Sequence, residues 1–157
     1  MNHSWSEAEL AYFAGIIDGE GCFTLRRSKR QRFGALSLQV GNTDVLLMQW
    51  IHAHFGGSLN LEQRRQAKHQ SVWRWIAASA DLETLLQRLI PYLITKKRQA
   101  ELTLAYRATL NAVSTSRRGR GVGRSTVRIS DDVKRERDAI HAELSALKRP
   151  HLRAVSA

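Results

Sequence analysis

Apolar and polar positions alternate along this chain with two different periods, which divide it into expected helices and strands. A first helix ending at Gly19 is expected, because a Ser6/Glu9 capping box comes before apolar residues at helical spacing. Those apolar residues are Leu10, Phe13, Ala14 and Ile17. Residues 22–30 and 35–40 instead alternate with period two, so each predicts a strand with one apolar and one polar face. A turn between the two strands makes them an antiparallel pair.

Further elements follow with the same two periods. In order, they are a helix capped by Asp44 and ended by Gly56-Gly57, strands at 59–62 and 72–78, a helix capped by Asp81, and helices at 96–113 and 130–147. Trp73 and Trp75 alternate along the last of these strands. We expect both in the core rather than stacked on nucleic-acid bases.

The order of elements predicts an α+β fold with an αββαββα core. Its four-stranded antiparallel sheet is expected to be saddle-like, with helices packed on one face and further helices at the C-terminus. The 157 residues, of which 43% are hydrophobic, suffice for a single domain without covalent staples. We expect the core over residues 6–113, a basic loop or arm over 114–129 and a C-terminal helix over 130–148.

The composition favours a polyanionic partner. The chain has 25 Lys and Arg against 14 Asp and Glu, a net charge of +11, which favours nucleic acid over a small-molecule substrate. Cys22 is the only cysteine, so no intrachain disulfide can form, and the six histidines lack the spacing of zinc ligands. There is no apolar run long enough for a membrane span and no signal-peptide pattern. We therefore expect a soluble, intracellular protein without a membrane partner.

The charges are unevenly distributed along the chain. Residues 26–32 and 117–128 each contain five basic residues and no acid, whereas residues 1–24 contain four acids and no Lys or Arg. An isolated basic run is usually a solvated face. On the first strand, however, Arg26 and Arg30 share the polar face with hydroxyl side chains. A two-stranded ribbon of this kind fits the DNA major groove, where such side chains read base edges.

The acidic segment ends in residues 12–21, which read Tyr-Phe-Ala-Gly-Ile-Ile-Asp-Gly-Glu-Gly. The small residues of this helix, which let another backbone come close, are Ala14, Gly15 and Gly19. Glu20 stands just beyond the negative end of the helix dipole, where an acid is disfavoured unless a cation, such as a divalent metal ion, compensates it. The alternative is a core helix with a glycine cap and a surface acid. The stretch resembles the LAGLIDADG signature of homing endonucleases, and the resemblance extends over about residues 6–113.

The resemblance implies a homodimer with a shared metal site. In single-motif members of the family, two such helices pack at a two-fold axis, and each delivers one acid to metal above the DNA minor groove. By this resemblance Glu20 holds Mg²⁺ together with the Gly19 carbonyl, with Mn²⁺ or Ca²⁺ as substitutes. Asp18 is expected to bond locally at the helix end. The expected dimer contacts are Phe13, Ala14, Gly15 and Asp18.

A second stretch supports the resemblance. Residues 90–100, Ile-Pro-Tyr-Leu-Ile-Thr-Lys-Lys-Arg-Gln-Ala, are similar to the family's helix-joining segment, and Lys96 takes the position of its active-site lysine. The alternative for Lys96 is an ordinary lysine at the start of a helix. Asn42 falls where relatives often carry a Gln that holds active-site water, so it is the third catalytic candidate although it is one methylene shorter. Leu46 departs from the basic residue that some relatives have four positions further on.

The implied function is a sequence-specific endonuclease that makes double-strand breaks in a long, near-palindromic DNA site by Mg²⁺-dependent phosphodiester hydrolysis. Double-stranded DNA is the expected partner, and a bacterial cytoplasm or an organelle the expected compartment. The expected DNA-binding residues are Thr24, Arg26, Ser28, Arg30, Arg32, Ser37, Gln39, Arg64, Arg74, Arg117, Arg118 and Arg120. Two alternatives stay open: a non-cleaving protein of the same fold that acts as an intron RNA maturase or DNA-binding regulator, and a basic protein that coats nucleic acid without metal.

Overall fold

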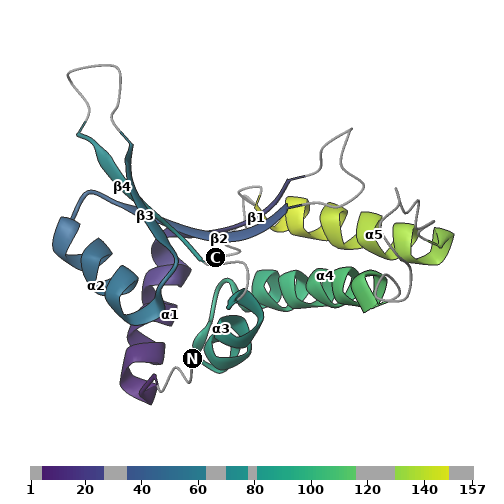
Figure 1. The fold of residues 1–157 in the computed structure, drawn as a ribbon, viewed down its shortest axis with the longest axis horizontal. Coiled ribbons are helices and arrows are strands. Elements are labelled where there is room, and N and C mark those ends of the chain that lie inside the picture. The colour runs from purple at the N-terminus through teal and green to yellow at the C-terminus, as the bar shows by residue number, and fades with distance from the viewer. Residues whose placement is uncertain (1–4, 27–34, 63–69, 78–80, 116–129, 149–157) are drawn as a thin grey trace, which may run out of the picture. The chain divides into compact units, whose positions relative to one another are not determined.

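The computed structural model describes residues 5–26, 35–62, 70–77, 81–115 and 130–148, which form helices and strands in the expected order (Figure 1). In chain order, the elements are α1 (Glu7–Glu20), β1 (Gly21–Arg26), β2 (Ala35–Asn42), α2 (Val45–Phe55), β3 (Ser58–Glu62), β4 (Val72–Ile76), α3 (Leu82–Leu89), the 3-10 helix η1 (Ile90–Tyr92), α4 (Lys97–Thr115) and α5 (Asp131–Leu147). The chain comprises two compact units, residues 1–104 and 105–157. The single domain stays a prediction.

The first unit is built on a four-stranded sheet. Its strands follow the order β1-β2-β4-β3, and every neighbouring pair is antiparallel. Helices α1, α2 and α3 lie on one side of this curved sheet (Figure 1). The predicted α+β fold with a four-stranded antiparallel sheet and helices on one face is therefore confirmed.

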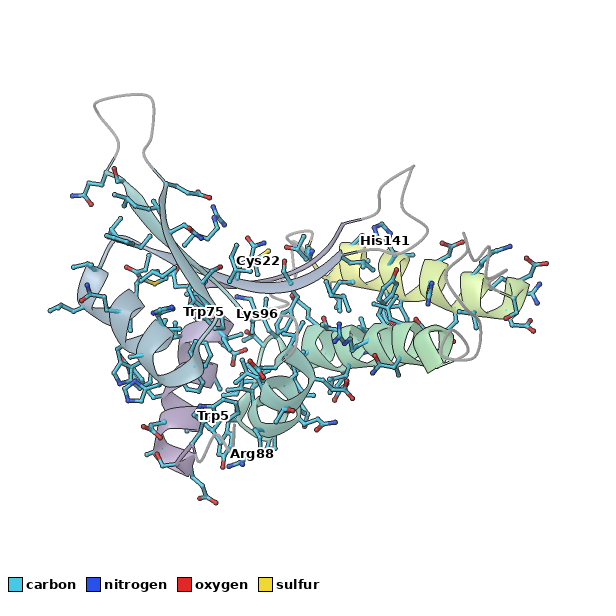
Figure 2. The ribbon with its side chains drawn as sticks, in the orientation of Figure 1. Trp5, Cys22, Trp75, Arg88, Lys96 and His141 are labelled. Atoms are coloured by element: carbon cyan, nitrogen blue, oxygen red, sulfur yellow. The ribbon has the colours of Figure 1, made fainter. Side chains whose placement is uncertain are left out.

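The core of the first unit lies between the sheet and α1 and α2. Phe13 of α1 stacks on Phe55 of α2 with ring centroids 4.1 Å apart, and its ring meets Trp75 of β4 edge-on at 5.3 Å. Trp75 lies on the helix-covered side of the sheet (Figure 2), and its indole Nε1 donates to the Gly56 carbonyl at 2.6 Å. Trp75 is thus a core residue as predicted, while Trp73 is only half-buried. Burying each such aromatic side chain contributes roughly 2–3 kcal/mol to folding.

Local signals fix most helix ends. Ser6 and Glu9 form the predicted capping box, in which the Ser6 N–H donates to the Glu9 carboxylate at 2.8 Å and the Glu9 N–H donates to Ser6 Oγ at 3.2 Å. Asp44 caps α2 by accepting the Leu47 N–H at 3.0 Å. Asp81 precedes α3 as predicted, but its side chain makes no capping hydrogen bond, so that part of the prediction is wrong.

Two glycines with positive φ end α2. Gly56 has φ 64° and Gly57 has φ 81°, a region that side-chain-bearing residues rarely adopt. A hydrogen bond joins the start of the described chain to α3. The Trp5 carbonyl accepts from Arg88 at 3.2 Å, and the two residues are labelled close together in Figure 2. None of the described helices is both long and apolar enough to cross a membrane.

The second unit contains the later turns of α4 and the whole of α5. Ser130 caps α5 by accepting the Val133 N–H at 3.4 Å, so the helix begins at Asp131, one residue after its predicted start. Arg137 of α5 is buried, with its guanidinium 5.6 Å from the centre of the Tyr106 ring. It donates to the hydroxyl and the carbonyl of Thr109, each at 2.8 Å. Helix α4 continues to Thr115, two residues beyond its predicted end, and the rest of the expected basic loop lies outside the described residues.

Candidate functional site

The junction of α1 and β1 presents Glu20 to solvent. Helix α1 ends at Glu20, and the Gly21 N–H donates to the Ile17 carbonyl before the chain continues as β1. A Cβ atom on residue 21 would lie 2.6 Å from the Ile17 oxygen, so only glycine permits this tight passage from helix to strand. The Glu20 side chain is exposed as a result.

Asp18 fastens this junction to the segment that precedes α4. Its carboxylate accepts the backbone N–H groups of Ile94 at 2.7 Å and Lys96 at 2.9 Å, and the hydroxyl of Thr95 at 3.1 Å. Burial alone would raise the pKa of Asp18, but these hydrogen bonds outweigh it and hold the pKa below its ordinary value. Asp18 therefore bonds at the end of α1, but its partners lie 76 to 78 residues further along the chain, so the expectation of local bonding is wrong.

Lys96 covers the C-terminal end of α1. Its ammonium donates to the carbonyls of Ile17 at 2.8 Å, Asp18 at 2.9 Å and Gly19 at 3.4 Å. These groups carry the negative end of the helix dipole, so a cation there is favourable. Burial lowers the pKa of Lys96, although the charges of Asp18, Cys22 and Glu20 act in the opposite direction. The cation that compensates the helix end is thus already a lysine of the same chain.

The oxygen donors at this junction suit a hard divalent cation. Glu20 and Gly19 are both exposed residues, and Mg²⁺ prefers oxygen ligands such as a carboxylate or a backbone carbonyl while keeping several waters. Among the residues that the structure describes, no three His, Cys, Asp or Glu side chains are grouped to hold a metal. The Asp18 carboxylate at this junction is engaged by Ile94, Thr95 and Lys96, which leaves Glu20 as the exposed carboxylate. The donor set fits Mg²⁺ only if a second copy contributes its own Glu20.

The Asn42 side chain is hydrogen-bonded to the backbone just before α2. Its side-chain oxygen accepts the Asp44 N–H at 2.9 Å, and Asp44 in turn caps the helix. In the described part of the chain, no hydrogen bond joins Asn42 to Glu20 or Lys96. Its water-orienting role therefore stays a prediction, for which the amide NH₂ group is the available donor.

A hydrogen-bonded chain of four side chains crosses the sheet on the face away from the helices. Arg74 of β4 donates from Nε at 2.5 Å and from Nη2 at 2.7 Å to the two carboxylate oxygens of Glu62 on β3. From Nη1 it donates at 3.2 Å to the Gln39 side-chain oxygen on β2, and the Gln39 amide donates to Ser37 Oγ at 2.9 Å. The Glu62 carboxylate accepts from Arg74 and thereby raises the pKa of Arg74. We call these four residues the Glu62–Ser37 network.

The register explains how the network forms. Arg74 stands directly opposite Gly41 on β2 and Asn60 on β3, so it reaches Gln39 and Glu62 as diagonal neighbours. Thr24 of β1 lies opposite Ser37 and continues the same face. Of the predicted DNA-binding residues, the structure thus gathers Thr24, Ser37, Gln39 and Arg74 on one surface. Glu62 is not among the predicted DNA-binding residues, although the alternation along β3 places it on the polar side.

One more of the predicted DNA-binding residues belongs to the described part of the chain. Arg26 is the last residue of β1 and pairs with Ala35 in the sheet. The remaining candidates lie outside the described residues: Ser28, Arg30, Arg32, Arg64, Arg117, Arg118 and Arg120.

Burial on α1 corrects two of the expected dimer contacts. Phe13 and Ala14 are both 0% exposed, because they pack inside the single chain and have no surface left for a partner copy. The opposite side of the helix is exposed, and its residues are Ala8, Ala11, Tyr12, Gly15 and Gly19. A Cβ atom on Gly15 or Gly19 would meet nothing within 4 Å. We call this side the open face of α1.

Comparisons with known proteins agree on one family. The model of the family described as LAGLIDADG endonuclease matches residues 13–112, whereas no curated protein matches the sequence. The structure of the archaeal intron-encoded homing endonuclease I-Vdi141I, complexed with DNA, is similar with a TM-score of 0.65 and 17% identity, over 94% of this chain and 89% of that one.

Two further solved structures resemble the chain in fold. The homing endonuclease I-CvuI in complex with the I-CreI target gives a TM-score of 0.51 and 21% identity, over 86% of this chain and 96% of that one. The LAGLIDADG meganuclease I-AabMI, bound to uncleaved DNA, gives 0.56 and 18%, over 86% of this chain and 44% of that one. At these identities the likeness carries the fold, and the chemistry rests on the residues themselves.

Proposed function

This chain belongs to the LAGLIDADG endonuclease family, and we propose that it is a sequence-specific homing endonuclease that cuts double-stranded DNA as a homodimer with Mg²⁺. The observation that carries the proposal is the position of Glu20. It is exposed at the junction of α1 and β1, next to the open face of α1, and its charge acts on the ammonium of Lys96, which donates to the carbonyl of the preceding residue. The alternative, a core helix with a glycine cap and a surface acid, gives no reason for an exposed helix face and a lysine to lie beside this acid.

The homodimer follows from the composition of the open face. Small residues along one side of a helix let the backbone of a second helix approach closely. Tyr12, which is 57% exposed, adds apolar area to the same side of α1. Two copies related by a two-fold axis would bring two Glu20 carboxylates together, which supplies the second acid that one chain lacks. Gly15 and Tyr12 thus replace Phe13 and Ala14 as proposed contacts.

In the proposed mechanism, the metal supplies the chemistry at the phosphate, and residues of the chain hold the metal and orient solvent. Bound Mg²⁺ supplies charge stabilisation on phosphoryl oxygens and water that is acidic enough to react near neutral pH. Glu20 and the Gly19 carbonyl are the groups of this chain that would hold it. Lys96 keeps the end of α1 in position and brings a positive charge close to Glu20, where phosphate charge would gather. Asn42 is proposed to orient solvent through its amide NH₂ group.

The face of the sheet that carries the Glu62–Ser37 network is the proposed DNA surface. Its side chains offer both donors and acceptors, which is what readout of base edges in the major groove requires. The net charge of +11 would supply most of the affinity through phosphate contacts, and this part should weaken steeply with salt. Sequence preference would come from the ordered side chains of the sheet.

The deciding experiment compares the wild-type chain with Glu20→Gln on a library of near-palindromic duplexes, with and without Mg²⁺. Binding and double-strand cleavage are scored separately, and Glu7→Gln at the far end of α1 is the control for loss of one negative charge. We expect wild type and Glu7→Gln to cleave only with Mg²⁺, and Glu20→Gln to bind equally well without cleaving. Selective binding without cleavage by wild type at every site would refute the nuclease and favour a maturase or a regulator.

A further inference from the structure

We infer that Glu62 is a positioning residue for DNA recognition: it fixes the guanidinium of Arg74 so that Arg74 discriminates between bases instead of anchoring a phosphate. The inference rests on the proposed function and deepens it, because it assigns separate tasks to the charges on the DNA surface. Glu62 is an acid on a face that is expected to meet a polyanion, so its presence there requires a reason.

The geometry of the pair restricts how Arg74 can bind. Glu62 takes the Nε and Nη2 side of the guanidinium through both carboxylate oxygens, and Gln39 takes one N–H of Nη1. A guanidinium has five N–H groups. Within the described contacts, this leaves one N–H on each terminal nitrogen. Two N–H groups on neighbouring nitrogens match the O6 and N7 acceptors of guanine in the major groove.

The charges of Arg74 and Glu62 also favour a role in base recognition over phosphate binding. Arg74 and Glu62 together carry no net charge, so the pair attracts phosphate weakly compared with an unpaired arginine. Their side chains are 35% and 51% exposed, and an ion pair so open to solvent contributes little to folding stability. The pair therefore adds little to folding stability or to general affinity for DNA. Its remaining effect is to fix the orientation of the Arg74 guanidinium. A fixed donor pair loses less side-chain entropy on binding than a free arginine does.

Gln39 and Ser37 extend the same constraint to β2. The Gln39 side-chain oxygen accepts from Arg74, and its NH₂ group donates to Ser37. These two hydrogen bonds fix the orientation of the Gln39 amide. Loss of Glu62 would therefore release Arg74 first and disturb Gln39 second. Both effects fall on the same few base pairs of each half-site, because the residues are neighbours on the sheet.

The test measures base discrimination instead of binding alone. Wild type is first selected against a randomised duplex library, with Ca²⁺ in place of Mg²⁺ so that cleavage does not compete. Affinities are then measured for the selected duplex and for every single base-pair change in it, at low and high salt. The variants are Glu62→Gln, Arg74→Lys and their combination, and Glu7→Gln is the control with the same change in charge.

We expect Glu62→Gln to lose about fivefold or more of the discrimination at a few adjacent base pairs, within the range of about 5- to 150-fold for one bidentate contact. Its affinity for unrelated DNA should rise and depend more steeply on salt, since Arg74 is then unpaired. Arg74→Lys should lose discrimination at the same base pairs, and Glu62→Gln should have no further effect in that background. Glu7→Gln should match wild type throughout.

The outcomes separate this inference from the proposed function. If wild type discriminates between sites but Glu62→Gln has the same profile, the inference is wrong while the proposed function stands. An even loss of affinity at all positions would also overturn it, because that result indicates a structural role. If wild type binds all duplexes equally, the proposed function fails and the inference fails with it.

Discussion

Asp18 and Lys96 hold each other by complementary groups: the Lys96 backbone N–H donates to the Asp18 carboxylate at 2.9 Å, and the Lys96 ammonium donates to the Asp18 carbonyl, also at 2.9 Å. The two residues are 78 positions apart in the chain. Because Glu20 follows Asp18 by two residues, the same contacts hold the backbone that carries the proposed catalytic acid. Stability and catalysis should therefore respond together to changes at this pair.

Asp18→Asn should lower the free energy of unfolding by about 2 kcal/mol at pH 7, because the amide NH₂ cannot accept a hydrogen bond where a carboxylate oxygen did, and the bonds that remain lose their charge. Urea unfolding measures the change. Glu7→Gln, on the exposed first turn of the same helix, should stay within about 0.5 kcal/mol of wild type. Equal stability of Asp18→Asn and wild type would mean that these contacts do not hold the folded state.

The stability of the folded chain should depend on pH through the charge of Asp18. The pKa of Asp18 in the folded chain lies below its ordinary value of 3.8, so the folded state favours the charged form. This contribution is fully present above pH 3.8 and is lost as the pH falls through the lower pKa of the folded state. Between pH 5 and pH 2, roughly, wild type should lose more stability than Asp18→Asn. Parallel acid-unfolding curves would contradict the prediction.

Lys96→Met should destabilise the fold by about 2 kcal/mol, since it removes the cation from three carbonyls at the end of α1. Lys97→Met is the matched control, because Lys97 is exposed and begins α4, where a positive charge is not favoured. Denaturant unfolding of both variants distinguishes them. If Lys96→Met is as stable as Lys97→Met but does not cleave DNA, Lys96 acts in catalysis and not as a cap.

The two glycines that flank Glu20 should respond oppositely to alanine. Gly21→Ala should cost about 1–3 kcal/mol, because its Cβ atom would lie 2.6 Å from the Ile17 oxygen. Gly19→Ala should be neutral or stabilising by up to about 1 kcal/mol in the single chain, since its Cβ atom meets open space on a helix. Thermal unfolding at low protein concentration compares them. A Gly21→Ala variant as stable as wild type would show that the junction can relax.

Gly15→Arg should abolish dimers without unfolding the chain. The new side chain projects into open space in the single chain but would occupy the surface proposed for the second copy. Sedimentation equilibrium should give a dimer for wild type and a monomer for Gly15→Arg, with similar helix content by circular dichroism. Gln87→Arg, on an exposed position of α3, introduces the same charge elsewhere and should remain dimeric. A dimeric Gly15→Arg would move the interface away from the open face of α1.

The sequence predicted the elements well because their signals are local. The Ser6/Glu9 box, the Asp44 cap and Gly56-Gly57 each act within a few residues, and each is present. The position of Lys96 was found only through its resemblance to a known motif, and its three carbonyl partners depend on the tertiary path of η1 past α1. No local pattern reports such a path.

Two errors have clear physical causes. Phe13, Ala14 and Gly15 are consecutive in the motif, but a helix turns successive residues to different sides, so Gly15 is exposed while Phe13 and Ala14 are buried. Glu62 was overlooked because its importance comes from a diagonal contact with Arg74, which requires the register of β3 on β4. Alternation along one strand gives the face of a residue but not its partners.

The Glu62–Ser37 network also bears on how the protein could be retargeted or could drift toward a new site. Ser37, Gln39, Glu62 and Arg74 come from three strands but share their hydrogen bonds, so altering one member changes the partners, and with them the orientation, of the others. Functional new combinations should then be separated by several simultaneous codon changes. A directed-evolution library for this chain should randomise the four positions as one block, because a change at one of them alters the hydrogen-bond partners of the others.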